Sequence, residues 1–174
     1  MNQVEENIRN RRSIRKYSDE NISDEYIEKL LKAAMQAPGS RMGAEPWEFI
    51  VVRNKETIKK LSEISPNTKL LAEANVAIVL IANMDKSHFK VVWQQDMSAA
   101  ATTLLLEAAN LGLGAVWLGI APREDRMNKI REIFNLSEEF KPFNIISLGY
   151  PAEGLENKFV DKFDESRIHF EKYC

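Results

Sequence analysis

The sequence predicts one domain that combines helices with strands, because segments of both periodicities alternate along the chain. Residues 76–82 form an apolar run without polar alternation, which is typical of a strand covered on both faces. Ile27, Leu30, Leu31 and Ala34 follow the i, i+3, i+4, i+7 spacing of a helix with one buried face. A chain of 174 residues with 44% hydrophobic residues is long enough to bury one core. We therefore expect a single domain over residues 1–174.

The first half of the chain predicts a short helix, then a helix, a strand and a further helix. Val4 and Ile8 have the i, i+4 spacing of a short helix. Ser23 is a suitable N-cap, since two acidic residues follow it, and Pro38-Gly39 ends that helix. Residues 47–52 are rich in aromatic and β-branched side chains and predict a strand. Residues 56–64 predict a short amphipathic helix.

The second half predicts a buried helix, two more core strands and a C-terminal arm. Residues 96–111 are apolar nearly all round, as expected of a helix buried in a core or against a partner. Residues 114–120 and 143–148 predict strands, and an amphipathic helix lies between them after Pro122. Residues 152–174 carry spaced large apolar side chains without a sustained period. We interpret them as an arm that packs on the partner subunit.

Composition limits the classes of function. The formal net charge of −2 and the isoelectric point near 5.8 argue against bulk nucleic-acid binding. The one cysteine permits no intrachain disulfide, and the longest apolar run is too short to span a bilayer, so a cytoplasmic protein is expected. The two histidines lack metal-ligand spacing, and no nucleophile motif is present, so we predict no metal site and no catalytic side chain. In an enzyme, a bound cofactor would then carry the chemistry.

A basic cluster near the N-terminus is the strongest chemical signal. Within six residues it places four cations around Ser13: Arg11, Arg12, Arg15 and Lys16. Two guanidinium groups can bind a phosphate bidentately, and a hydroxyl adds a neutral donor. The order R-R-S-x-R thus favours an anion with several oxygens, although a solvated basic segment would have the same composition.

Three further segments combine with this cluster. Residues 37–49 form a helix end, a tight polar loop and a strand opened by Pro46-Trp47. Residues 112–119, G-L-G-A-V-W-L-G, offer small residues where a flat ring could approach the backbone. Residues 148–153 form a strand end and a turn. In this order and spacing the four segments resemble the nitroreductase family of FMN-dependent oxidoreductases, from about Ile8 into the C-terminal arm.

The resemblance implies an α+β fold with a central mixed or antiparallel sheet flanked by helices, in an intertwined homodimer that binds FMN at its interface. It implies that the phosphate and ribityl chain are held by Arg11, Arg12, Ser13 and Arg15. It places Pro38, Gly39 and Ser40 against the flavin of the other subunit, and backbone amides near flavin N5 around Leu118 and Gly119. A basic residue of the arm often adds to the phosphate site, for which Lys162 is the best match and Lys158 a poorer one.

The loop over residues 38–46 departs from the family pattern. It is one residue longer, Met42 or Gly43 falls where an Asn is expected, and Glu45 replaces the Gln before Pro46-Trp47. An ionised carboxylate can only accept hydrogen bonds, so Glu45 could not donate to a flavin carbonyl. This change bears on flavin affinity and potential and leaves the phosphate anchor unaffected.

The function that the resemblance implies is two-electron transfer from NADH or NADPH through FMN to a nitroaromatic, a quinone or a similar small acceptor, with ping-pong kinetics. Arg15 is the candidate for the N1–C2=O end of the flavin. One alternative is a flavin-binding module, such as a sensor or carrier, without turnover. Another is a binding protein for a different phosphorylated ligand.

Overall fold

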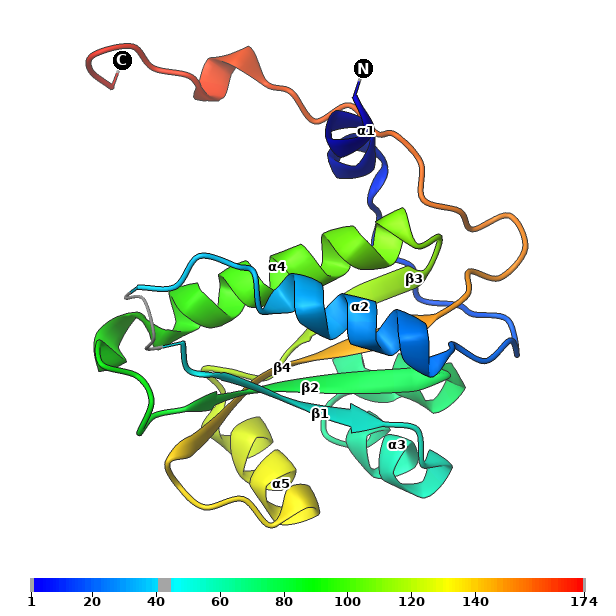
Figure 1. Cartoon of the computed structure of the whole chain (residues 1–174), viewed down its shortest axis with the longest axis vertical. Coiled ribbons are helices and arrows are strands. Elements are labelled where there is room, and N and C mark those ends of the chain that lie inside the picture. The colour runs from blue at the N-terminus through cyan, green and yellow to red at the C-terminus, as the bar shows by residue number, and fades with distance from the viewer. Residues whose placement is uncertain (1, 41–44, 174) are drawn as a thin grey trace.

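The computed structural model describes residues 2–40 and 45–173, and they form an α+β fold (Figure 1). The helices and strands follow one another in the order α1 (Gln3–Asn10), α2 (Asp24–Ala34), β1 (Trp47–Val52), α3 (Lys55–Ser62), β2 (Val76–Asn83), α4 (Trp93–Asn110), β3 (Gly114–Gly119), α5 (Glu124–Phe134) and β4 (Phe140–Gly149). Short 3-10 helices are η1 (Pro66–Glu73), η2 (Lys90–Val92) and η3 (Glu165–Arg167). All helices and strands expected from periodicity are present, whereas the 3-10 helices were not predicted.

The sheet of the described residues has four strands in the order β1-β2-β4-β3, and every neighbouring pair is antiparallel. The central strands β2 and β4 are almost fully buried, which explains why their sequences lack polar alternation. The register of this pair shifts between Leu80 and Ile81, beside Phe143 and Asn144 of β4. Strand β3 lies at the outer edge of the sheet.

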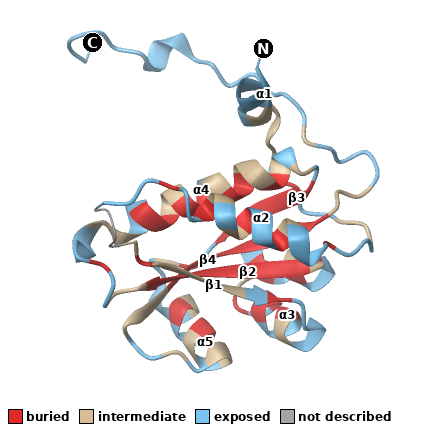
Figure 2. Cartoon of the chain, in the orientation of Figure 1, coloured by how far each residue is buried: buried red, intermediate tan, exposed pale blue. Residues whose placement is uncertain are grey.

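Helices cover both faces of the sheet (Figures 1 and 2). Helices α2 and α4 lie on one face, where Leu30 and Leu104 are fully buried in the larger core cluster. Helices α3 and α5 lie on the other face, where Leu61 and Ile130 are fully buried in a second cluster. Burying two such faces removes most of the apolar surface of the chain from water, which is the main stabilising contribution to a fold of this size.

Local capping agrees with the sequence at the start of α2. Ser23 Oγ accepts a hydrogen bond from the Tyr26 N–H at 3.2 Å, which confirms the predicted N-cap. Helix α4 begins at Trp93, three residues before the predicted start, and β4 begins at Phe140, also three residues early. Element ends are set by packing as well as by pattern, and both extensions lie next to the aromatic contact of Trp93 with Phe143.

Helix α1 and the C-terminal arm project from the body of the domain (Figures 1 and 2). No residue of α1 is buried, and Val4 and Ile8 are exposed. The arm beyond Pro151 is exposed over nearly all its length, including Phe163, Phe170 and Tyr173. The arm therefore adds little to the core of its own chain.

Candidate functional site

The basic segment runs along the outer edge of β3. Ser13 forms a parallel bridge with Ala115, and the Ile14 N–H donates to the Ala115 carbonyl at 3.0 Å. The Tyr17 hydroxyl donates to the Ile14 carbonyl at 2.9 Å and shares a 3.0 Å hydrogen bond with Ser147 Oγ on β4. Burial raises the pKa of Tyr17 to about 12, so the hydroxyl keeps its proton and its donor role. Strand pairing and Tyr17 thus fix the segment that the sequence identified.

The first two arginines of the segment lie at the C-terminal end of α1. The Arg11 N–H donates to the Asn7 carbonyl, and burial, followed by the charge of Arg12, lowers the pKa of Arg11. The Arg12 guanidinium donates to the carbonyls of Arg9 and Asn10, where it satisfies acceptors that the helix end leaves open. In the single chain Arg12 therefore acts as a helix cap.

The remaining edge of β3 faces outward without a neighbouring strand in the described residues. Because the Ala115 carbonyl accepts from Ile14 on the outer side, strand alternation turns the N–H and C=O of Trp117 and Gly119 outward as well. The same alternation turns the Leu118 N–H toward β4. A Cβ added to Gly119 would meet no atom within 4 Å, so the space beside the strand end is open. A flat ring could approach the Gly119 backbone here.

A hollow of about 520 Å³ lies against this edge. It brings Arg15 together with Leu118 and Gly119, as the resemblance implies, and adds two polar residues of η1, Asn67 and Lys69. The full lining is Arg15, Pro66, Asn67, Lys69, Leu70, Val116, Trp117, Leu118 and Gly119. The hollow thus combines two cations, a carboxamide and outward-facing backbone amides, which suits a planar ligand with acceptor atoms and negative charge.

Asn67 and Lys69 could not be predicted from periodicity, because a 3-10 helix lacks the 3.6-residue period. The available signal was Ser65-Pro66, a residue pair typical of a helix start. Thr68, between the two missed residues, is fully buried and donates to the Ser62 carbonyl at 3.1 Å. That buried anchor holds η1 in place beside β3.

Arg12 and Lys162 line a different hollow, of about 460 Å³, between α1 and the arm. The Arg9 guanidinium lies 4.1 Å from the centroid of the Phe159 ring on the arm, a cation–π contact. Asn157 also connects the arm to the basic segment, since its Oδ1 accepts from the Arg12 N–H at 2.8 Å and its Nδ2 donates to the Leu113 carbonyl at 3.1 Å. Of the predicted phosphate residues, Arg12 and Lys162 line this hollow and Arg15 lines the one beside β3, whereas Arg11 and Ser13 line neither of the two.

The loop residues Pro38, Gly39 and Ser40 do not line the hollow beside β3, and Ser40 is bound to the first turn of α4. Ser40 donates twice to Asp96 Oδ1, from its N–H at 2.9 Å and from its hydroxyl at 2.6 Å. Asp96 is buried in the first turn of α4, where a carboxylate is favoured by the helix dipole. The loop end is thus fixed to the domain, away from Arg15. The expectations for Met42 and Gly43 fall outside the described residues.

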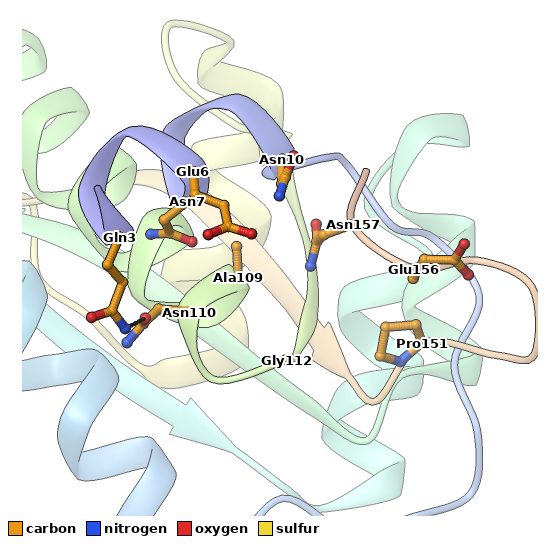
Figure 3. A pocket seen from close by; sticks show the side chains of 10 residues that line it. All are labelled: Gln3, Glu6, Asn7, Asn10, Ala109, Asn110, Gly112, Pro151, Glu156 and Asn157. Atoms are coloured by element: carbon orange, nitrogen blue, oxygen red, sulfur yellow. Dashed lines mark hydrogen bonds between the residues drawn. The ribbon is translucent and has the colours of Figure 1, made fainter. Parts of the chain in front are cut away.

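A third hollow, of about 370 Å³, lies between α1, the end of α4 and the turn after β4 (Figure 3). Carboxamides and carboxylates line it, among them Asn10, Glu6 and Glu156. The Gln3 Nε2 donates to Asn110 Oδ1 at 3.4 Å across one side of it. This lining includes carboxylates and no cation, so it does not suit a phosphate or another anion.

Two kinds of site do not occur in the described part of the chain. No helix there is both long and apolar enough to cross a membrane. Within residues 2–40 and 45–173, no group of three or more His, Cys, Asp and Glu side chains could hold a metal ion.

Comparison with known proteins identifies the family. The model of the nitroreductase family matches residues 8–69 and 65–150, and the chain belongs to this family. A relative from Methanothermobacter thermautotrophicus, provisionally named NADH dehydrogenase/NAD(P)H nitroreductase, is 45% identical over 98% of this chain and 87% of its own length.

Solved structures show the same fold. A protein from Clostridium acetobutylicum, provisionally named NADH oxidase, has a TM-score of 0.92 and 53% identity over 96% of this chain and 99% of its own. A Desulfovibrio desulfuricans protein provisionally described as a nitroreductase, solved in complex with FMN, has a TM-score of 0.83 and 28% identity over 100% of this chain and 99% of its own. The α+β fold expected from the resemblance is thereby confirmed.

Proposed function

We propose that this chain is an FMN-dependent oxidoreductase that passes two electrons from NADH or NADPH to a nitroaromatic, a quinone or a similar small acceptor, with ping-pong kinetics. The observation that carries the proposal is the open outer edge of β3 at Gly119, flanked by the cations Arg15 and Lys69. Relatives with NAD(P)H nitroreductase names, and the FMN complex of a structural neighbour, support it. The protein acts as a single cytoplasmic domain.

The side chains of the hollow fit FMN. Outward-facing N–H groups of the β3 edge, Arg15, Lys69 and the Asn67 carboxamide supply donors for the acceptor atoms of an isoalloxazine ring. Arg11, Arg12, Ser13 and Lys162 bind the phosphate and the ribityl chain in this proposal. Bound FMN would supply the redox chemistry of the two-electron transfer. The chain itself binds and orients the ring and needs no nucleophile.

The complete site requires a second copy of the chain. Asp96 holds Ser40 at the start of α4, and Pro38, Gly39 and Ser40 do not line the hollow beside β3, so we assign these three residues to the flavin of the partner subunit. The arm exposes Phe163, Phe170 and Tyr173 by 76–89% of their surfaces, a large apolar area for a chain in water. We therefore extend the proposal to a homodimer in which residues 152–174 pack on the partner, with one FMN in each of two interfacial sites.

A measurement of turnover distinguishes the proposed oxidoreductase from a flavin-binding module without activity. The purified protein loaded with FMN should oxidise NADH or NADPH when menadione or a nitrofuran is present, with parallel double-reciprocal lines. Binding of FMN without turnover would instead support a sensor or carrier. Glu45 is the feature that favours that second candidate, since it replaces a donor with an acceptor beside the ring.

A further inference from the structure

One peptide group at the end of β3 is held from both sides. The Gly119 carbonyl accepts a hydrogen bond from Arg126 Nη1 at 2.9 Å. On the same peptide, the Ile120 N–H donates to the Phe143 carbonyl at 3.2 Å, and the Ile120 side chain is fully buried. Two bonds to one peptide fix its plane, and with it the direction of the preceding strand end.

Arg126 reaches this carbonyl from the first turns of α5. Its guanidinium stays charged at any physiological pH, and a charged donor makes a stronger hydrogen bond than a neutral one. The nearest acid along the helix, Asp125, forms its ion pair with Arg123, at 3.1 Å. The positive charge of Arg126 lies beside the carbonyl of Gly119, a residue that lines the hollow.

We infer that Arg126 is a positioning residue for the cofactor: it fixes the Gly119–Ile120 peptide and raises the cofactor's midpoint potential. The inference rests on the proposed function. Two-electron reduction adds negative charge to a flavin, and a nearby cation favours the more negative state. A guanidinium at the strand end thus stabilises the reduced form more than the oxidised form, while the fixed Gly119–Ile120 peptide holds the strand end in one orientation beside the hollow.

The test compares three variants with wild type. Arg126→Gln removes the charge and keeps a donor, Arg126→Lys keeps a cation, and Arg123→Gln removes an exposed arginine three residues away whose side chain pairs with Asp125. Each variant is titrated with FMN, and its midpoint potential is measured by equilibration with a reference dye. Hydrogen exchange of a peptide that covers residues 117–121 is followed without FMN.

Arg126→Gln should weaken binding of the reduced cofactor about tenfold more than that of the oxidised form, which lowers the two-electron potential by about 30 mV. Its strand-end amides should exchange faster than those of wild type, even without FMN. Arg126→Lys should lie closer to wild type in potential, and Arg123→Gln should match wild type in both measurements.

An unchanged potential in Arg126→Gln, with FMN still bound, would overturn the inference. A potential that falls equally in Arg126→Lys and Arg126→Gln would also overturn it, because charge would not be the cause. Failure of the wild-type protein to bind FMN would instead overturn the proposed function, so the two failures are distinguishable.

Discussion

Tyr17 connects the basic segment to the core through its hydroxyl. The hydroxyl bonds to the Ile14 carbonyl and to Ser147, and a Cβ added to Gly149 would lie 2.5 Å from the Tyr17 ring. The segment is therefore held by one phenol and by its pairing with β3. Because nothing in R-R-S-x-R-x-Y distinguishes an anchoring tyrosine from a solvated one, this role could not be predicted from the sequence.

Tyr17 also predicts a loss of stability at high pH. Its folded-state pKa of about 12 exceeds the ordinary value of 10.0, so the folded chain holds this proton more tightly than the unfolded chain. The Tyr17 hydroxyl makes its full contribution to the free energy of unfolding below pH 10. About 2 to 3 kcal/mol of that free energy is lost as the pH rises toward 12. Denaturant unfolding at pH 8 and pH 11.5 should show a smaller decline in Tyr17→Phe than in wild type. Equal declines would contradict the assignment.

Alanine substitutions at two glycines are expected to have opposite effects on stability and on FMN binding. An added Cβ at Gly149 would lie 2.4 Å from Asn75 Oδ1, whereas one at Gly119 would enter open space. Gly149→Ala should destabilise the fold by about 1–3 kcal/mol because the site is overpacked. Gly119→Ala should leave unfolding nearly unchanged but weaken FMN binding at least about tenfold, because the methyl group occupies the space beside the strand end. Urea unfolding and FMN titration of both variants measure this contrast.

At the scale of elements, periodicity predicted the helices and strands but not their neighbours in space. The 3.6-residue spacing of Ile27, Leu30 and Ala34 was sufficient to predict α2, because that helix buries one face. The continuous apolar run was sufficient to predict β2, because that strand is buried on both faces. Helix η1 was missed, since eight residues of 3-10 helix give no such pattern, and Asn67 and Lys69 were missed with it. Arg126 was missed because its contact depends on how α5 packs under β3.

The family resemblance predicted a set of site residues that come from several helices, strands and loops. Arg15, Leu118 and Gly119 line one hollow, and their roles toward a flavin stay predictions. Arg12 and Lys162 lie together elsewhere, and Ser40 is bound to α4. The proposed homodimer accounts for this division, since one chain would then hold only part of each interfacial site, and the roles of these residues remain predictions.

At the scale of the whole molecule, the exposed arm predicts a stable dimer. Light scattering at micromolar concentration should give twice the mass of a single chain. The double substitution Phe163→Asp and Phe170→Asp should shift the protein toward monomer and weaken FMN binding together, because charges at an apolar interface are costly to bury. A wild-type monomer that binds FMN tightly would contradict the dimeric site.

The central claim is that the cationic hollow at the outer edge of β3 holds FMN. Equilibrium titration of apo protein with FMN, in wild type and in Arg15→Gln/Lys69→Gln, tests it most directly. We expect saturation at one FMN per chain in wild type and a dissociation constant at least about a hundredfold higher in the double variant, a loss of about 2.7 kcal/mol of binding free energy. Equal affinity in both proteins, or no saturable binding in wild type, would contradict it.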